Sequence, residues 1–398
     1  MNLDWVIIGG GIHGVHIAAR LLGEANVERE KLRIIDPGER LLQRWRTCSQ
    51  TTGMKYLRSP AVHHLDLSPW SLERYAGHPK TRKPGLFAPP YDRPKLTLFN
   101  DHCDQVIEDF NLSDAHIKAR ATACVLGCDS VSVHLSNGVH VSAANVVLAM
   151  GMSEQPEWPQ WAPRNNAKVH HIFSKDFNGW PSENETIAVV GGGISAGQVA
   201  LRLVSEGHNV HLVSRHSLRE HQFDSDPGWL GPKFMASFDR ELDVERRREL
   251  ISKARHKGSV PPDVKQALRL AIRRDELQWH EDEANGFVAH DADTVELSLI
   301  SGTSLKVNRI LLATGFAAHR PGGKMIDELV KTGALPCASC GYPIVDKALR
   351  WHPRVFVSGP LAELELGPSS RNISGARRAG DRLVETVRQE QNLHVAQT

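Results

Sequence analysis

Two glycine-rich segments are the parts of this 398-residue sequence best suited to chemistry. Each follows an apolar run and carries small residues at the spacing of a dinucleotide-binding turn: Gly9, Gly11 and Gly14 in the first, Gly191, Gly193 and Ala196 in the second. Such a turn between a buried strand and a helix exposes backbone N–H groups to a pyrophosphate. We therefore predict two phosphate-binding loops, which also contain Ile12, His13 and Ser195.

The residue that ends the strand after each loop distinguishes one dinucleotide from another. The predicted strand 32–36 ends in Asp36, followed by Pro37. A carboxylate there accepts from a ribose hydroxyl and repels a 2′-phosphate, so the first loop suits FAD or NAD. The predicted strand after the second loop ends in Ser214 and Arg215, and a guanidinium holds a 2′-phosphate with two hydrogen bonds. The second site is therefore predicted to bind NADPH, with NADH as the alternative.

The elements that must position these loops occur twice in the chain. Helices are predicted over 16–22 and 198–204, directly after the loops. A hairpin over 130–142 leads to a strand that ends at Gly151, and a hairpin over 294–307 leads to a strand that ends at Gly315. The repetition predicts two copies of one unit, and so an α/β fold with two Rossmann-like dinucleotide-binding domains.

The order of these units predicts that the second domain is inserted into the first. We expect a discontinuous FAD-binding domain over 1–155 and 305–398, and an NADPH-binding domain over 156–304. The proline-containing stretch 153–166 reads as a linker, and 239–277 as a charged helical segment whose basic run 253–257 could touch a nucleotide phosphate.

The C-terminal part of the chain is predicted to return to the first domain. A buried strand over 355–357 precedes Gly359, and a helix that follows Asn372 is expected to run to about Val387. The positive end of this helix would face a bound flavin. Gly359 and Asn372 are therefore included among the predicted cofactor-binding residues.

Composition excludes several other classes of protein. With 40% hydrophobic and 24% charged residues the chain is neither disordered nor a coiled coil, and a formal charge of +2 does not indicate a nucleic-acid partner. The longest apolar runs, such as 146–150, are too short for a membrane helix, and the N-terminus lacks a basic signal region. We expect a cytoplasmic protein without a metal site; homo-oligomerisation is left open.

These motifs resemble those of flavoproteins with two dinucleotide-binding domains. The glycine loops, the strand endings 148–151 and 312–316 and the element at Gly359 resemble class B flavin monooxygenases and the bacterial lysine and ornithine N-hydroxylases. The segment 53–60, after Trp45, resembles the loop that those families place against the isoalloxazine. The resemblance implies FAD in the first site, near Trp45. It also implies candidate polar groups near the flavin ring: Lys55, Arg58 and His63.

The same resemblance implies the reaction. NADPH would reduce FAD, reduced flavin would add O₂ to give a C4a-(hydro)peroxide, and one oxygen atom would pass to a small substrate with a nucleophilic nitrogen or sulfur, or to a carbonyl compound. The segment 167–173 keeps histidines but lacks the Phe and Gly of the flavin monooxygenase pattern, which leaves the substrate open. The alternative is an NAD(P)H-dependent flavin reductase without oxygenation.

Cysteine positions bear on a third chemistry, reduction through a dithiol beside the flavin. Cys337 and Cys340 form a C-x-x-C pair, but they follow the second domain, whereas related reductases carry theirs near the first helix or before the second glycine loop. Their role is left open. A non-enzymatic flavoprotein would be expected to lose its second loop, and both loops are intact. The leading prediction is a FAD- and NADPH-dependent monooxygenase acting on a small molecule and O₂.

Overall fold

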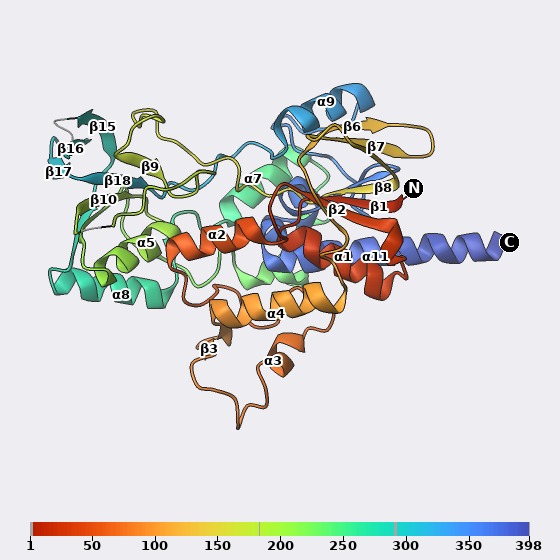
Figure 1. Cartoon of the computed structure of the whole chain (residues 1–398), viewed down its shortest axis with the longest axis horizontal. Helices are drawn as coiled ribbons and strands as arrows, with labels where there is room; N and C mark the ends of the chain where they lie inside the picture. The colour runs from red at the N-terminus through yellow and green to blue at the C-terminus, as the bar shows by residue number, and fades with distance from the viewer. Residues whose placement is uncertain (1–2, 183, 290–292, 398) are drawn as a thin grey trace.

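Two sheets with parallel central strands, each with a glycine loop after one of those strands, dominate the computed structural model, which describes residues 3–182, 184–289 and 293–397 (Figure 1). The first begins with β1 (Leu3–Ile8), α1 (Ile12–Glu24) and β2 (Leu32–Asp36). The β-branched residues of β1 favour a strand, and the glycines end it before α1. The sheet order β19-β20-β8-β1-β2-β5 puts β1 between two parallel neighbours.

The second sheet repeats this arrangement. Its order is β14-β11-β10-β18-β9, and all neighbouring strands are parallel. The glycine loop lies between β10 (Thr186–Val190) and α5 (Ile194–Ser205). The other strands are β9 (Val169–His171), β11 (Asn209–Ser214), β14 (Leu277–Glu281) and β18 (Arg309–Leu312). The predicted α/β fold with two Rossmann-like domains is confirmed.

The second domain continues beyond residue 305, through the hairpin predicted over 294–307 and the strand that follows it. β15 (Ala284–Ala289), β16 (Val295–Leu299) and β17 (Ser304–Val307) form an antiparallel sheet that leads into β18. Because β18 pairs with β10 and β9, strand pairing keeps the chain in the second domain up to Leu312. The expected boundary at 305 falls inside this unit, since the return to the first domain requires the last parallel strand to be complete.

The remaining elements of the first domain complete its sheet and surround it. They are α2 (Gln43–Thr52), α3 (Ser71–Tyr75), β3 (Phe87–Ala88), β4 (Arg93–Pro94), α4 (Leu96–Asp109), β5 (His116–Lys118), β6 (Ala121–Leu126), β7 (Val131–Leu135), β8 (His140–Leu148), α9 (Gly323–Gly333), β19 (Arg350–His352), β20 (Val355–Val357), α10 (Glu363–Leu366) and α11 (Ile373–Gln397). The predicted hairpin is β7 with the first half of β8. The final helix α11 extends past Val387, and its end projects from the body (Figure 1).

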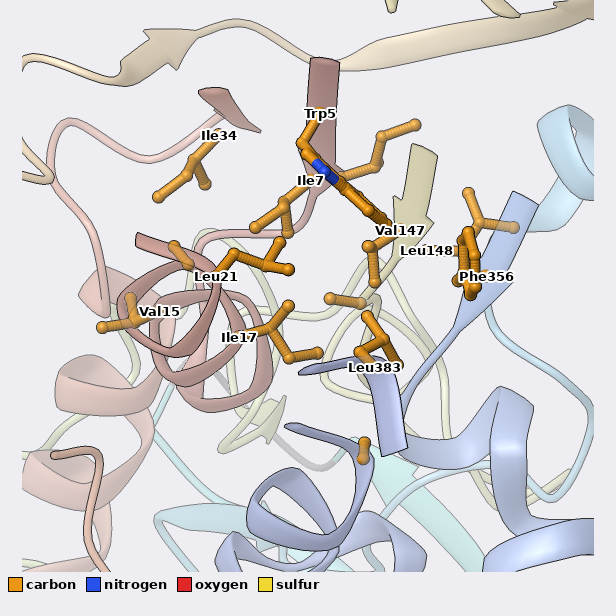
Figure 2. Packing of buried hydrophobic residues seen from close by; sticks show 14 of the residues in the cluster. Trp5, Ile7, Val15, Ile17, Leu21, Ile34, Val147, Leu148, Phe356 and Leu383 are labelled. Carbon is orange, nitrogen blue, oxygen red and sulfur yellow. The ribbon is translucent and has the colours of Figure 1, made fainter. Parts of the chain in front are cut away.

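The core of the first domain lies between the sheet and the helices α1 and α11. Figure 2 shows Ile17 of α1 and Leu383 of α11 close to Ile7 and Val147 of the sheet. All four side chains are fully buried. Burial of such side chains contributes about 1.5–3 kcal/mol each to folding. The core therefore fixes where α1 begins, and with it the first glycine loop.

The helical segment expected over 239–277 divides between the two domains. It contains α7 (Val244–Ala254), the short strand β13 (Ser259–Val260) and α8 (Pro262–Arg273), and it is preceded by β12 (Arg219–Glu220) and α6 (Pro232–Phe238). α8 packs on α5 of the second domain. By contrast, α7 docks on α10 of the first domain, where Arg247 Nη1 lies 2.9 Å from the Glu365 carboxylate.

Within the described ranges, no helix combines the length and apolar character needed to cross a membrane.

Close packing at Gly14 generates a stability prediction. A Cβ atom at Gly14 would lie 1.7 Å from the carbonyl oxygen of Gly9, whereas one at Gly11 would meet no atom within 4 Å. We expect Gly14→Ala to lower the free energy of unfolding by about 1–3 kcal/mol or more, because backbone atoms must move apart. Gly11→Ala should stay within about 0.5 kcal/mol of the parent protein. Urea unfolding of the cofactor-free proteins measures both; equal stabilities would contradict the packing argument.

Candidate functional site

A single large cavity of about 2630 Å³ lies between the two domains and is lined by both glycine loops. Most predicted site residues line it: Gly9, Gly11, Ile12, His13, Asp36, Pro37, Trp45, Arg58, His63, Gly151, Gly191, Gly193, Ser195, Ser214, Arg215, Gly315 and Asn372. Those that do not are Gly14, Lys55, Ala196 and Gly359. Residues more than 300 positions apart in the chain thus share one wall, which only the folded chain brings together.

The first loop presents backbone surface to the cavity. Gly9 adopts a φ of +115° and its N–H donates to Ile35 O at 2.9 Å, which turns the chain out of β1. Gly11 is the N-cap of α1 and provides no side chain to cap the first-turn N–H groups. The first turn of α1 has no acidic residue. Open space at Gly11 and a helix N-terminus without a counter-charge together fit a pyrophosphate.

Asp36 is placed where a ribose would be recognised. Its Oδ2 accepts from Gly10 N and its Oδ1 from Gly38 N, both at 2.8 Å. A carboxylate oxygen can accept more than one hydrogen bond, so each atom keeps capacity for a hydroxyl group. The backbone contacts fix the carboxylate beside the loop, and its negative charge disfavours a 2′-phosphate there.

The second loop has the same backbone form and a different charge. Gly191 adopts a φ of +150°, and a Cβ atom on it would lie 2.5 Å from Ala313 O. The N-cap of α5, Gly193, again provides no capping side chain. Arg215 lines the cavity at the end of β11, is exposed, and has no hydrogen-bond or ion-pair partner among the described residues. Its guanidinium is therefore available to an anion.

Ser214 differs from Arg215, because the fold already uses its hydroxyl. The side chain is 2% exposed, donates from Oγ to His216 O, and accepts from Trp279 Nε1, both at 2.9 Å. The sequence identifies the position of Ser214. It does not show that both hydrogen bonds of the hydroxyl are already made, because the bond from Trp279 depends on the packing of β14 beside β11. Ser214 shapes the strand end, and Arg215 carries the free charge.

Gly359 lies under the cavity wall, and Asn372 forms part of it. Gly359 is buried with a φ of +66°, and a Cβ atom on it would lie 3.6 Å from the ring of His13. His13 Nδ1 is 2.8 Å from Ser358 Oγ. Burial lowers the pKa of His13 to about 4, so the ring is neutral near pH 7. Asn372 lines the cavity just before α11 begins.

The three polar groups expected near the flavin ring have different surroundings. Lys55 is exposed and outside the cavity lining. Arg58 donates to three consecutive carbonyls of the second domain, those of His221, Gln222 and Phe223, at 2.7–2.9 Å. His63 lines the cavity, and burial lowers its pKa to about 4. Arg58 therefore joins the domains, and His63 is neutral.

Several cavity residues were not predicted individually. Arg248, Glu363 and Arg371 line the same wall as Arg255 and Lys257. The basic run 253–257 carried a signal for Arg255 and Lys257. No local pattern singled out Arg248, in a helix rich in charged residues, or Arg371, in a polar turn, and only the docking of α7 on α10 brings them together.

The cysteines and the metal-ligating side chains were compared with the cavity lining. Of the cysteines, Cys48 lines the cavity, and burial raises the pKa of its thiol. Cys337 and Cys340 lie outside the lining, and all six cysteines are free. In the part of the chain that the structure describes, no three His, Cys, Asp or Glu side chains are grouped to hold a metal ion.

Comparisons with solved structures show the same fold in proteins of low sequence identity. Ornithine hydroxylase from Pseudomonas aeruginosa aligns with a TM-score of 0.77 and 16% identity, covering 98% of this chain and 99% of that one. The ornithine N-hydroxylase of Kutzneria sp. 744 gives 0.74 and 17%, over 98% and 100%. Bacillithiol disulfide reductase from Bacillus cereus gives 0.64 and 15%, over 98% and 100%. No curated protein sequence matches the chain.

The sequence profile of a known enzyme family provides the assignment. It matches residues 6–245, which contain both glycine loops and most of the cavity lining. The match confirms that the chain is an oxidoreductase enzyme, and the solved structures confirm the resemblance to N-hydroxylases at the level of the fold. The chain belongs to the pyridine nucleotide-disulphide oxidoreductase family.

Proposed function

We propose that this protein is a FAD-containing, NADPH-dependent monooxygenase of a small substrate with a nucleophilic nitrogen or sulfur, or of a carbonyl compound. The observation that carries the proposal is the single cavity that both glycine loops line. Two dinucleotides bound at these loops would extend into one shared space. That arrangement fits electron transfer from one bound coenzyme to the other, followed by chemistry on a substrate in the same cavity.

The first loop fits FAD. Backbone N–H groups at the start of α1 would hold the pyrophosphate, Asp36 the ribose, and the N-terminus of α11 beside Asn372 the far end of the coenzyme. Flavin supplies the capacity to accept hydride and to react with O₂. The apolar side chains of Trp45, Met54, Leu57 and Val62 line the cavity and would keep water from the reacting atoms.

The second loop fits NADPH. Arg215 is unpaired within the described chain and stands where a 2′-phosphate would lie, at the end of the strand after the loop. Lys257 precedes Gly258, whose Cα is 3.6 Å from the position of a Cβ atom on Gly193. Lys257 also has no ion-pair partner in the described residues and would add positive charge beside the coenzyme phosphates.

The cysteine positions favour oxygenation over dithiol chemistry. A dithiol mechanism requires two thiols at the flavin, and among the described residues only Cys48 lines the cavity. Two structural relatives are ornithine hydroxylases, and the structure from Kutzneria is of its enzyme with reduced FAD, NADP⁺ and L-ornithine. These likenesses support the monooxygenase proposal.

The second candidate is an NAD(P)H-dependent flavin reductase that passes electrons onward without oxygenation. Similarity of the fold to a bacillithiol disulfide reductase favours it, because the same two-loop architecture serves reduction in that protein. The side chains that hold the coenzymes would be the same in both cases. The distinction therefore rests on the fate of O₂.

Adding a methyl group to the first glycine loop, at Gly11, tests whether FAD binds there. We expect Gly11→Ala to weaken FAD binding by about tenfold or more, because its side chain would occupy the space that the pyrophosphate needs. Gly231→Ala is the matched control, since Gly231 also caps a helix with open space around it but lies outside the cavity lining. Fluorescence titration with FAD measures both; equal affinities would count against the assignment.

Recognition of the 2′-phosphate is tested at Arg215. Arg215→Ala should raise KM for NADPH by about tenfold or more and leave KM for NADH almost unchanged, because only NADPH carries the second phosphate. Arg269→Ala, an exposed arginine of α8 outside the cavity, is the control. Steady-state kinetics with both coenzymes gives the ratio. An equal effect on the two coenzymes would remove the argument for 2′-phosphate recognition.

The fate of O₂ separates the two candidate functions. Enzyme reduced anaerobically with NADPH is mixed with ¹⁸O₂ in the presence of amines, thioethers or ketones, and products are examined by mass spectrometry. Monooxygenation predicts one ¹⁸O atom in an organic product and H₂O₂ below the amount of NADPH consumed. H₂O₂ in full proportion to NADPH with every substrate class would support the reductase instead.

A further inference from the structure

Three arginines from two distant parts of the chain line the cavity. Arg248 comes from α7, Arg255 follows that helix, and Arg371 precedes α11; all three line the cavity. Their side chains are 24%, 17% and 20% exposed. We call these residues, together with Asp224 and Glu363, the arginine cluster. Glycine loops bind phosphates through the backbone and do not need this second concentration of charge.

The arginine cluster is held rigidly by its neighbours. Glu363, 1% exposed, pairs with Arg248 and accepts from Arg371 Nε at 2.7 Å. Arg371 Nη2 also donates to Tyr342 Oη at 2.9 Å, and the guanidinium carbon of Arg248 lies 4.3 Å from the centre of the Tyr342 ring. Tyr342 is fully buried and donates to Ala318 O. The guanidinium groups are therefore positioned before any ligand arrives.

These ion pairs do not neutralise all the positive charge of the arginine cluster, and they leave N–H groups of Arg255 without an acceptor in the described part of the chain. Arg255 Nη2 lies 3.0 Å from Asp224 Oδ2, and no other partner of this guanidinium is present among the described residues. The three guanidinium groups face two carboxylates, so the arginine cluster keeps a net positive charge. Burial lowers the pKa of Arg255, Asp224 opposes this change, and Arg371 and Arg248 lower the pKa further. An anion would relieve this mutual repulsion.

We propose that the arginine cluster binds a carboxylate of the substrate, and that this substrate carries no ammonium group next to the carboxylate. The inference rests on the proposed function, because it assigns the substrate to the same cavity. Two guanidinium groups can each offer paired N–H donors to one carboxylate. Asp224 and Glu363 already pair with arginines, so their negative charge is offset and an adjacent cation would meet a net positive arginine cluster.

Two further charged residues of the cavity, Asp226 and Lys257, differ in how they are held. Asp226 also lines the cavity, but it is exposed and caps the turn 227–230 by accepting from Gly228 N at 2.7 Å. Lys257 adds further positive charge on the side toward the second glycine loop. An organic acid would be attracted by Lys257 and by the guanidinium groups of the arginine cluster. The ammonium of an α-amino acid would be repelled by the same cations.

The test uses acetate, acetamide and glycine, three probes of similar size that differ in charge. Each is titrated into the FAD-loaded protein and its affinity is measured by ligand-detected NMR. We expect saturable acetate binding, with acetamide and glycine weaker by about tenfold or more, because charged hydrogen bonds are lost or opposed. Equal binding of acetate and acetamide would overturn the anion site, and equal binding of acetate and glycine would overturn the exclusion of an adjacent ammonium.

Variants locate the binding within the cavity. Arg255→Gln should raise the Kd for acetate by about tenfold or more. Arg255→Lys, which keeps a cation beside Asp224, should restore most of the affinity, and Arg269→Gln on the surface of α8 should leave it unchanged. An unchanged Kd in Arg255→Gln would reject the arginine cluster as the site.

Two further measurements separate this inference from its alternatives. Saturating NADP⁺ should leave acetate binding intact; displacement of acetate would mean that the arginines serve the phosphates of the coenzyme instead of a substrate. The absorbance of bound FAD and its bleaching by NADPH are recorded in the same samples. If both persist while acetate fails to bind, the carboxylate site is wrong and the proposed function stands. If both are absent, the proposed function fails.

Discussion

The orientation of the two parallel sheets depends on arginine side chains that donate across the domain boundary to backbone carbonyls. Arg44 reaches the carbonyl of Phe173, and Arg58 reaches three consecutive carbonyls over 221–223. From the second domain, Arg202 donates to the carbonyls of Gln50 and Thr51 at the end of α2. A guanidinium offers several N–H groups in fixed directions, so each contact restrains rotation as well as distance. The common cavity exists because these contacts hold the two glycine loops on its opposite sides.

Two buried carboxylates, Glu363 and Glu365, hold the helical segment over 239–277 against the first domain through ion pairs. Glu365 is contacted by Arg247, Arg382 and Lys347, and Glu363 by Arg248 and Arg371. Isolated carboxylates at these depths would be costly, and the surrounding cations offset that cost. As a result α7, which the chain order assigns to the second domain, forms part of the first-domain wall. This helical segment thereby contributes charge to a site that neither Rossmann-like unit would build alone.

Two histidines of the cavity lining, His13 and His63, contribute polarity without charge near pH 7. Burial lowers the pKa of both His13 and His63 to about 4. Arginine and lysine side chains, among them Arg215, Arg255 and Lys257, bring positive charge to the cavity. Coenzyme and substrate anions would meet this charge, and the reaction would rely on bound coenzymes for electron transfer instead of on a protein nucleophile.

The sequence by itself determined what local chain geometry controls. Glycine spacing after an apolar run specifies the turn from strand to helix, so both loops, their strands and the contrast between Asp36 and Arg215 could be predicted from it. Only the tertiary structure decided contacts between segments far apart in the chain. In the folded chain the Ser214 hydroxyl is already hydrogen-bonded, and Lys55 lies outside the cavity. Arg58 forms hydrogen bonds between the two domains. The tertiary structure also joined Arg248 and Arg371 around Glu363, because the docking of α7 on α10 depends on complementary shape and charge that no local pattern encodes.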